Sequence, residues 1–154
     1  MRRKFILGVA SWGGLGYLPK GPGTWGTLGA IPLWWVLATL ERPVFVAVCF
    51  VFVGVAILVS HEAEKIYGSH DVGHIVIDEV AGLLVTVVGV PCRWPEVLAA
   101  FVLFRLLDIV KPWPIGWIDR RVPGGAGVVL DDVAAGVIGC LVLHAARLLL
   151  GGWW

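Results

Sequence analysis

Five apolar stretches follow one another along the chain, separated by polar connections, at residues 28–40, 44–60, 75–90, 97–110 and 132–150. Within them, apolar and polar positions do not alternate at a period of two, and no rhythm of short strands and turns is visible, so the pattern predicts helices. A helix needs about 20 apolar residues to cross a bilayer. The first, third and fourth stretches are shorter, so the pattern leaves open whether they cross it fully.

The composition indicates that these helices are partly solvated by lipid. Hydrophobic residues make up 58% of the chain and charged residues 15%, whereas a soluble domain has about 45–50% and about 25%. The nine tryptophans agree, because indole rings favour the membrane–water interface. We therefore predict an all-α fold, with residues 1–154 forming one domain: a compact, membrane-associated bundle of about five main helices. A very apolar soluble helical protein is the alternative.

The connections between the stretches predict how the bundle is oriented. Most polar residues lie in three long connections, which are residues 11–27, 61–74 and 111–131. If the chain reverses at each of the short connections, the long ones share one side, which also holds most of the Lys and Arg residues. Because positively charged loops stay in the cytoplasm, we expect a cytoplasm-facing polar layer, with Trp153 and Trp154 at the opposite interface.

Helix lengths predict that acidic residues far apart in the sequence meet at one depth. Eleven steps lead from Glu79 to Val90, and eleven lead from Val97 to Asp108. Since each helical residue rises by about 1.5 Å, the chain returns at Asp108 to the depth of Glu79. We expect the same depth for the residues that open the third and fifth helices and close the second, which are Asp78, Asp131, Asp132, His61 and Glu62.

The acidic pairs lie in the segments VIDEV and VLDDV, where burying a charge near lipid is costly unless it is paired or metal-bound. A helix N-cap is the alternative role for Asp131, and also for Asp78. An N-cap role does not explain why each segment has two adjacent acids. Nor does it explain the position of Asp108 near a helix C-terminus, where the macrodipole disfavours an anion. A divalent cation would relieve the surplus negative charge, and oxygen ligands near phosphate suit Mg²⁺.

The segment GPGTWG, residues 21–26, fits the glycine pattern of dinucleotide-binding loops. That pattern requires a preceding strand inside a βαβ unit, which this sequence does not predict, so we expect no nucleotide. The segment does precede a helix, with Thr24 near its N-terminus, and this arrangement suits a phosphate. The net charge of +1 gives no bulk attraction to nucleic acid.

Two further patterns allow more than one interpretation. His70 and His74 are four residues apart and would chelate zinc if they lay on a helix, but Gly68 and Gly73 favour a loop there. The glycine-rich run at 124–127 is either a flexible connector or a place where backbone N–H groups approach an anion.

Three segments carry a resemblance to a known family: GLGYLPKGPGTWGTLGAIPLW, HIVIDEVAG and FRLLDIVKPWPIGWIDRRVPGGAGVVLDDVAAG. They resemble the phosphatidylglycerophosphatase A family in order and spacing, and together they cover about half of the chain. Lys20-Gly21 is a mild departure, because small or apolar residues usually precede the P-G-T core in that family. The resemblance implies an all-α, Mg²⁺-dependent lipid phosphatase of the bacterial inner membrane. Such an enzyme hydrolyses phosphatidylglycerophosphate to phosphatidylglycerol and phosphate, with its active site facing the cytoplasm.

The family motifs match Asp78, Glu79, Arg105, Asp108, Lys111, Asp119, Arg120, Asp131 and Asp132. From their chemistry we expect one or two Mg²⁺ ions to be held by Asp78, Glu79, Asp131 and Asp132. The residues expected to bind the substrate phosphate are Arg105, Lys111, Arg120 and Thr24. The catalytic candidates are Asp108, Glu79 and Asp131, with Asp108 orienting the attacking water or completing the metal site. No covalent nucleophile is evident, so a metal-activated water is the expected nucleophile.

A non-enzymatic protein is the competing interpretation. A membrane cation-binding or carrier protein could use the same acidic layer as an ion site, and it would bind Mg²⁺ without releasing phosphate. For the enzyme, the expected partners are phosphatidylglycerophosphate as the lipid substrate and the bilayer itself.

Overall fold

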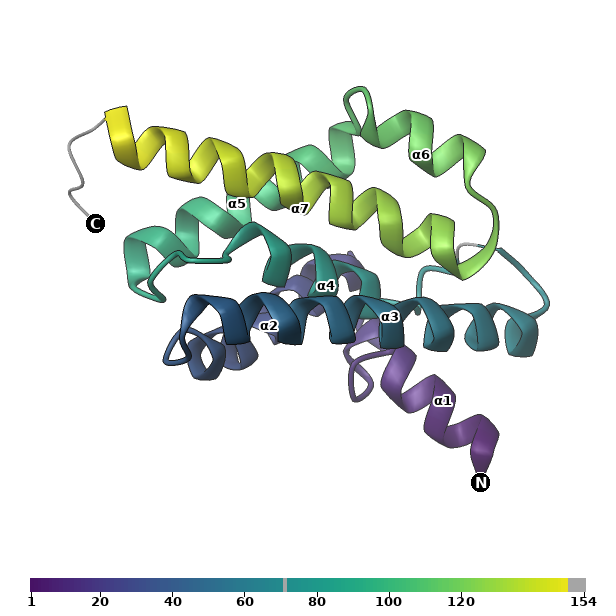
Figure 1. Cartoon of the computed structure of the whole chain (residues 1–154). Coiled ribbons are helices and arrows are strands. Elements are labelled where there is room, and N and C mark those ends of the chain that lie inside the picture. Colours follow the sequence, from purple (N-terminus) through teal and green to yellow (C-terminus); the bar gives the residue numbers. More distant parts are fainter. Residues whose placement is uncertain (71, 150–154) are drawn as a thin grey trace.

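The computed structural model describes residues 1–70 and 72–149, and in them every regular element is a helix (Figure 1). The elements are α1 (Arg2–Ala10), the 3₁₀ turn η1 (Leu15–Tyr17), α2 (Pro22–Leu37), α3 (Arg42–Tyr67), α4 (Ile77–Thr86), α5 (Trp94–Val110), α6 (Ile115–Arg121) and α7 (Gly124–Leu149). The all-α prediction is confirmed. The expected number of about five helices is too low, since the described residues form seven.

The two additional helices lie where the apolar pattern is weakest. The α1 helix begins with the basic residues Arg2, Arg3 and Lys4, and α6 has only seven residues in the polar connection that follows α5. Neither segment is long or apolar enough to stand out as a stretch of its own. The five expected stretches correspond to α2, α3, α4, α5 and α7.

The α4 helix occupies the centre of the bundle, between the two long helices α3 and α7 (Figure 1). Eight of its ten residues are buried, because it is apolar around most of its circumference. Its ten residues span about 15 Å, so α4 is too short to cross a bilayer. The third apolar stretch is therefore a core helix packed among its neighbours.

Close contact between α4 and α7 depends on two glycines. A Cβ atom on Gly82 would lie 2.5 Å from Phe104 Cε2 and 2.8 Å from the carbonyl oxygen of Asp132. A Cβ atom on Gly136 would lie 2.5 Å from the carbonyl oxygen of Gly82. Small residues at these positions let the two backbones approach, and the contact places the first turn of α4 beside the acidic residues of α7.

Three helix ends differ from the sequence expectation. The α2 helix begins at Pro22, so the segment 21–26 forms its first turn, with Gly21 in the left-handed region at φ 81°. The α3 helix continues to Tyr67, past His61 and Glu62. The α7 helix begins at Gly124, so residues 124–127 are its first turn, and the VLDDV acids lie about two turns inside the helix.

Two helices, α3 and α7, are long and apolar enough to cross a membrane by length and composition. The exposed face of α3 carries large apolar side chains, among them Phe50, Val51 and Leu58. The two helices run antiparallel, so the end of α3 lies beside the start of α7 (Figure 1). Trp153 and Trp154, expected at the far interface, lie outside the described residues.

Candidate active site

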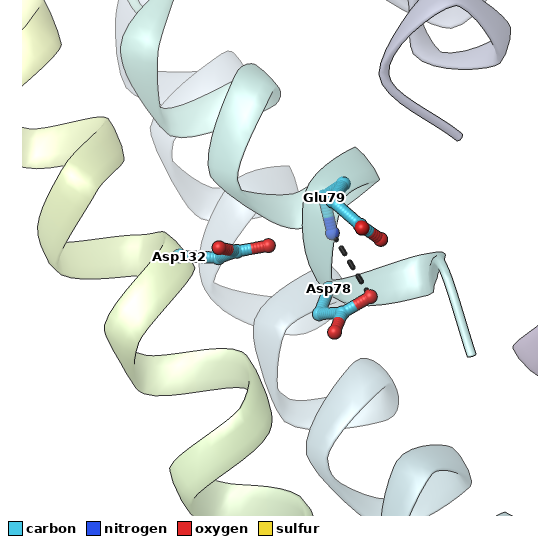
Figure 2. Close-up of side chains that lie close together, drawn as sticks. All are labelled: Asp78, Glu79 and Asp132. Carbon is cyan, nitrogen blue, oxygen red and sulfur yellow. Dashed lines mark hydrogen bonds between the residues drawn. The ribbon is translucent and has the colours of Figure 1, made fainter. Parts of the chain in front are cut away.

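Carboxylates from two helices meet in a cluster that we call the three-acid cluster: Asp78, Glu79 and Asp132 (Figure 2). Asp78 and Glu79 lie in the first turn of α4, and Asp132 extends from α7. One oxygen atom of each residue lies within 4.8 Å of the corresponding atoms of the other two. Acids separated by more than fifty residues therefore do converge, as the helix lengths predict.

The cluster forms one wall of a polar cavity of about 200 Å³, which we call the acidic cavity. Its lining residues are His70, Asp78, Glu79, Asp108, Lys111, Asp119, Gly127, Val128, Asp131 and Asp132. Six of the predicted site residues are among them. The predicted phosphate ligands Arg105, Thr24 and Arg120 do not line it.

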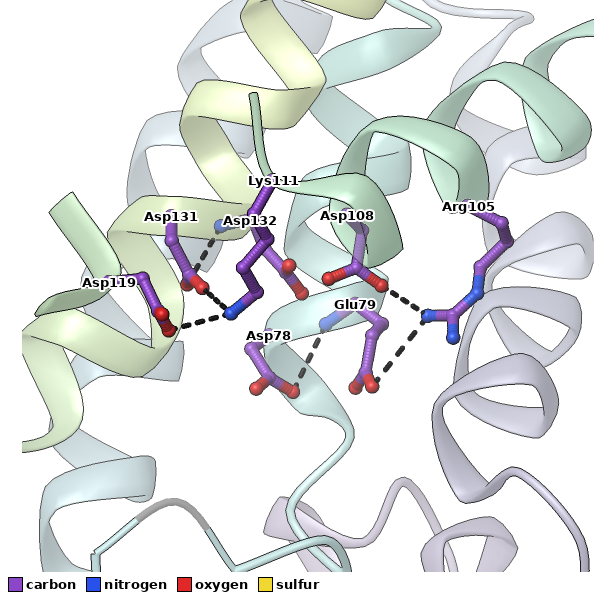
Figure 3. Close-up of polar contacts among 8 residues, drawn as sticks. All are labelled: Asp78, Glu79, Arg105, Asp108, Lys111, Asp119, Asp131 and Asp132. Carbon is purple, nitrogen blue, oxygen red and sulfur yellow. Dashed lines mark hydrogen bonds and ion pairs between the residues drawn. The ribbon is translucent and has the colours of Figure 1, made fainter. Parts of the chain in front are cut away.

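Arg105 links two of the acids (Figure 3). Its Nη1 atom donates a hydrogen bond to Asp108 Oδ2 at 2.6 Å and lies 3.9 Å from Glu79 Oε1. The other carboxylate oxygen of Glu79 is buried and has no hydrogen-bond partner among the described residues. Leaving a buried charged oxygen unsatisfied is costly, and an oxygen-liganded cation beside Asp78 and Asp132 would satisfy it. The residues present therefore fit Mg²⁺.

Lys111 links a second pair of acids on the other side of the cavity (Figure 3). Its Nζ atom donates to Asp119 Oδ1 and to Asp131 Oδ2, both at 2.6 Å. Asp131 was expected to be a metal ligand, but the structure pairs it with this lysine and leaves it outside the three-acid cluster. The lysine is the C-cap of α5 in the left-handed region, at φ 46°, a backbone state in which non-glycine residues are uncommon.

Burial dominates the electrostatics of the α4 acids. It raises the pKa of Asp78 well above its usual value, and the neighbouring charge of Glu79 raises this pKa further. Burial also raises the pKa of Glu79, which hydrogen bonding to Asp78 opposes. A protein without a bound cation therefore resists full ionisation of this pair.

At Lys111, by contrast, hydrogen bonding outweighs the effect of burial. Burial alone would lower the pKa of Lys111, but its hydrogen bonds to Asp119 and Asp131 outweigh this effect and raise the pKa above its usual value. The hydrogen bond from Lys111 lowers the pKa of Asp119. The cavity thus has a fixed positive charge on one wall and crowded carboxylates on the other.

The N-cap interpretation of the acids is wrong for both segments. Asp131 lies in the interior of α7, where its Oδ1 accepts a hydrogen bond from the backbone N–H of Asp132 at 2.9 Å. The N-cap of α4 is Val76, and Asp78 lies inside the first turn. There Asp78 Oδ1 accepts from the N–H of Glu79 at 3.1 Å, a position where the helix macrodipole favours an anion.

The start of α2 lies against the acid layer through Gly23 rather than Thr24. A Cβ atom on Gly23 would overlap the Glu79 carboxylate and would lie 3.0 Å from Arg105 Nη1. Sequence reasoning singled out the hydroxyl of Thr24 and missed the glycine. The glycine itself could have indicated this contact, because glycine is favoured where the backbone approaches a neighbouring side chain too closely for a Cβ atom.

His70 is a second residue to which the sequence gave no role in the site. It lines the acidic cavity, and its Nδ1 atom contacts Glu64 Oε1. It does not pair with His74 for zinc, because His74 Nδ1 instead donates to the carbonyl oxygen of Gly16 at 2.9 Å. The spacing of the two histidines drew attention to a metal pair, whereas only one of them reaches the acids.

Arg120 lies in a neighbouring open groove of about 730 Å³, which we call the outer groove. Its lining residues are Glu64, Lys65, Gly68, Ser69, His70, Asp119, Arg120, Arg121, Val122, Pro123 and Gly124. The outer groove and the acidic cavity share His70 and Asp119. The two hollows therefore adjoin at these residues.

Comparisons with known proteins relate the chain to one family. The family model described as Phosphatidylglycerophosphatase A matches residues 8–147. A phosphatidylglycerophosphatase A of Escherichia coli is 42% identical over 85% of this chain and 77% of its own length. One of Haemophilus influenzae is 36% identical over 87% and 83%.

A third relative, from Bacteroides thetaiotaomicron, is provisionally named a phosphatidylinositol-3-phosphatase. It is 36% identical over 90% of this chain and 91% of its own length. All three names describe removal of a phosphate group from a lipid. No solved structure matches the chain.

Proposed function

The chain belongs to the phosphatidylglycerophosphatase A family, and from this premise we propose that the acidic cavity is the centre at which its reaction takes place. The enzyme is a lipid phosphatase that hydrolyses the terminal phosphate monoester of phosphatidylglycerophosphate, leaving phosphatidylglycerol and inorganic phosphate. One observation carries the assignment of the site. Three carboxylates lie within 4.8 Å of one another, Arg105 lies 3.9 Å from one of them, and Lys111 lines the same cavity.

We propose that Asp78, Glu79 and Asp132 hold Mg²⁺. The support is the oxygen-only donor set and the buried, unpartnered oxygen of Glu79. When bound, the ion would neutralise charge on the phosphoryl oxygens and lower the pKa of a water molecule.

Lys111 and Arg105 supply the fixed positive charge for the phosphoryl group. Both side chains are already held in place by acids, Lys111 by Asp119 and Asp131, and Arg105 by Asp108. Donors that need no rearrangement stabilise the charge that develops in the transition state most effectively. Lys111 lines the cavity directly, whereas Arg105 lies behind the lining residues Glu79 and Asp108, with which it pairs.

Water is the nucleophile that the cavity supports. Among the described residues that line the cavity there is no serine, threonine or cysteine. Asp108 Oδ1 is the carboxylate oxygen of that residue not engaged by Arg105 Nη1, which donates to Oδ2. We assign to Asp108 the task of orienting the attacking water and accepting its proton.

His70 is placed to assist the leaving group. It lines both the acidic cavity and the outer groove, so it lies at the boundary between the phosphoryl group and the rest of the lipid. The bond that breaks spans this boundary. Glu64 holds Nδ1 of the ring, which leaves Nε2 to donate a proton to the departing glycerol oxygen.

We further propose that the protein lies in the bacterial inner membrane, with the cavity on the cytoplasmic side. Two helices have the length and hydropathy of membrane spans. The basic residues Lys65, Arg120 and Arg121 line the outer groove at the end of the bundle where α3 finishes and α7 begins. Arg2 joins them through an ion pair with Glu62 at 3.3 Å. The end of a helix bundle that carries positive charge tends to stay in the cytoplasm.

The first test is phosphate release from phosphatidylglycerophosphate in detergent, with Mg²⁺, with EDTA, and with Mg²⁺ restored. We expect release only with Mg²⁺, and a loss of about 100-fold or more in Glu79→Gln and Asp132→Asn. The matched control is Glu96→Gln, which removes another buried, unpartnered acid from α5 outside the cavity. Magnesium binding without phosphate release would instead support the cation-binding alternative. Near-normal rates in both variants would refute the proposed site.

A further inference from the structure

The outer groove is larger than the acidic cavity and, apart from His70 and Asp119, its residues have no role in the chemistry described above. Its volume is about 730 Å³, against about 200 Å³ for the cavity. Because the two hollows adjoin at His70 and Asp119, a lipid head group whose end lies among the acids has its next segment beside the groove. What the groove contacts is therefore the part of the substrate next to the phosphoryl group.

Two arginines give the outer groove positive charge that no ion pair among the described residues neutralises. Arg120 and Arg121 lie in the last turn of α6, are exposed, and form no ion pair with any described residue. The groove's two acids are both engaged, Asp119 by Lys111 and Glu64 by His70. Lys65 adds a third positive charge, whose partner Glu62 does not line the groove.

The substrate carries a group that fits this charge. Phosphatidylglycerophosphate has two phosphates: the terminal monoester and a phosphodiester that joins the head-group glycerol to the diacylglycerol. With the monoester among the acids and the glycerol passing the shared rim, the phosphodiester reaches the outer groove. A phosphodiester keeps one negative charge at neutral pH, and guanidinium groups bind phosphate oxygens with paired hydrogen bonds.

We propose that the outer groove binds the phosphodiester of the substrate, with Arg120 and Arg121 as specificity-determining residues. This inference rests on the proposed function of the acidic cavity. The contact between the arginines and the phosphodiester makes the enzyme prefer a lipid phosphate monoester that carries a second phosphate. A lipid with a single phosphate, such as phosphatidic acid, lacks this contact. Arg120 thereby contacts substrate, but at the phosphodiester and not at the phosphoryl group that is removed.

The test compares two substrates with the same acyl chains, phosphatidylglycerophosphate and phosphatidic acid, each in uncharged detergent micelles. The variants are Arg120→Gln, Arg121→Gln and the double change. We expect kcat/KM for phosphatidylglycerophosphate to fall about tenfold in the double variant, mainly through KM. We expect kcat/KM for phosphatidic acid to stay within about twofold of the wild type.

Matched controls separate this contact from general charge effects. Arg93→Gln removes an exposed arginine at the start of α5, which does not line the groove, and should leave both substrates unaffected. The double replacement by lysine keeps the charge and should restore part of the selectivity, because only the paired geometry is lost.

Two results would overturn the inference. An equal fall on both substrates would mean that the arginines act on the terminal phosphoryl group or on folding, and no fall on either would mean that the groove does not bind the lipid. Failure of the proposed function is distinct, because the wild-type protein would then release no phosphate from phosphatidylglycerophosphate.

Discussion

The unpartnered oxygen of Glu79 determines how the acidic cavity responds to its surroundings. It is buried next to Asp78, and burial raises the pKa of both side chains. Without a cation, ionising the pair requires burying negative charge that nothing compensates, which is costly. A bound divalent cation removes that cost, so metal binding and protonation compete for the same oxygens.

The first prediction at this scale concerns stability against pH. As pH rises above about 4, the unfolded chain loses its protons before the folded one, whose pKa values are raised, so the metal-free protein becomes less stable with rising pH. Mg²⁺ should offset this loss, raising Tm by about 5–10 °C at 100 times its Kd. The measurement is thermal unfolding in detergent at pH 5 and pH 8, with EDTA or with Mg²⁺. We expect the increase in Tm caused by Mg²⁺ to be larger at pH 8.

Asp132→Asn is the variant that decides this prediction, because it removes one of the three acids and should remove most of the Mg²⁺ effect. Glu96→Gln should keep that effect. A Tm that Mg²⁺ leaves unchanged at both pH values would contradict the assigned metal site.

The second residue-scale prediction concerns His70. Glycerol is a poor leaving group and needs a proton as it departs, whereas a phenolate with a pKa near neutrality does not. We therefore expect His70→Gln to slow hydrolysis of phosphatidylglycerophosphate by about 100-fold and to affect an aryl phosphate much less. Initial rates on both substrates measure the difference. Equal losses would assign His70 a structural or binding role.

At the scale of elements, the α4–α7 contact holds the acids together. Gly82 and Gly136 allow the two backbones to meet, and the facing ends of the contact carry Asp78 and Asp132. Any added side chain must push α7 away from α4, since the nearest atoms to Gly136 include backbone oxygen. The distance between the carboxylates is thus set by residues with no polar group of their own.

The prediction for this contact is that Gly82→Ala destabilises the protein by about 1–3 kcal/mol and reduces phosphate release. Gly54→Ala is the control, because an added Cβ on this α3 glycine meets no atom within 4 Å. It should be neutral or slightly stabilising, as alanine is the better helix former. Thermal unfolding and activity of the two variants give the comparison. Equal effects from both would mean that close approach is not required.

The sequence predicts the elements better than their ends. Counting along the third and fourth stretches placed Glu79 and Asp108 together correctly, because both acids lie near the ends of their helices. The same reasoning put Asp131 at a helix start, and it failed because glycine-rich residues, which are poor helix formers, nevertheless form the first turn of α7.

Side-chain pairing could not be predicted in the same way. Which acid Lys111 contacts depends on the rotation of α7 about its axis and on the position of α6, and neither leaves a signal in the hydropathy pattern. The proximity of Gly23 to Glu79 likewise requires the packing of α2 against α4. The sequence could therefore predict the set of acids but not their division between the three-acid cluster and Lys111.

At the scale of the whole molecule, the cavity lies near one end of the two longest helices. Each has 26 residues, or about 39 Å, which exceeds the hydrocarbon thickness of about 30 Å. Asp131 and Asp132 lie about two turns from the start of α7. A cavity at this depth meets the head-group region when the helices span the bilayer.

The corresponding prediction is a topology measurement. In a variant without the three native cysteines, Arg121→Cys should react with a membrane-impermeant thiol reagent only from the cytoplasmic side. Arg93→Cys, at the other end of the bundle, should react only from the opposite side. Intact cells and inverted vesicles provide the two exposures. Reaction of both positions from one side would contradict the proposed crossing.

If both hollows bind the substrate as proposed, the position of His70 and Asp119 between them also predicts the order in which the products depart. A lipid product that still occupies the outer groove would obstruct the exit of the phosphate ion behind it, so we expect phosphatidylglycerol to leave first and inorganic phosphate to follow. In an ordered release, the last product binds the same free enzyme as the next substrate. We therefore expect inorganic phosphate to inhibit the enzyme competitively with its lipid substrate.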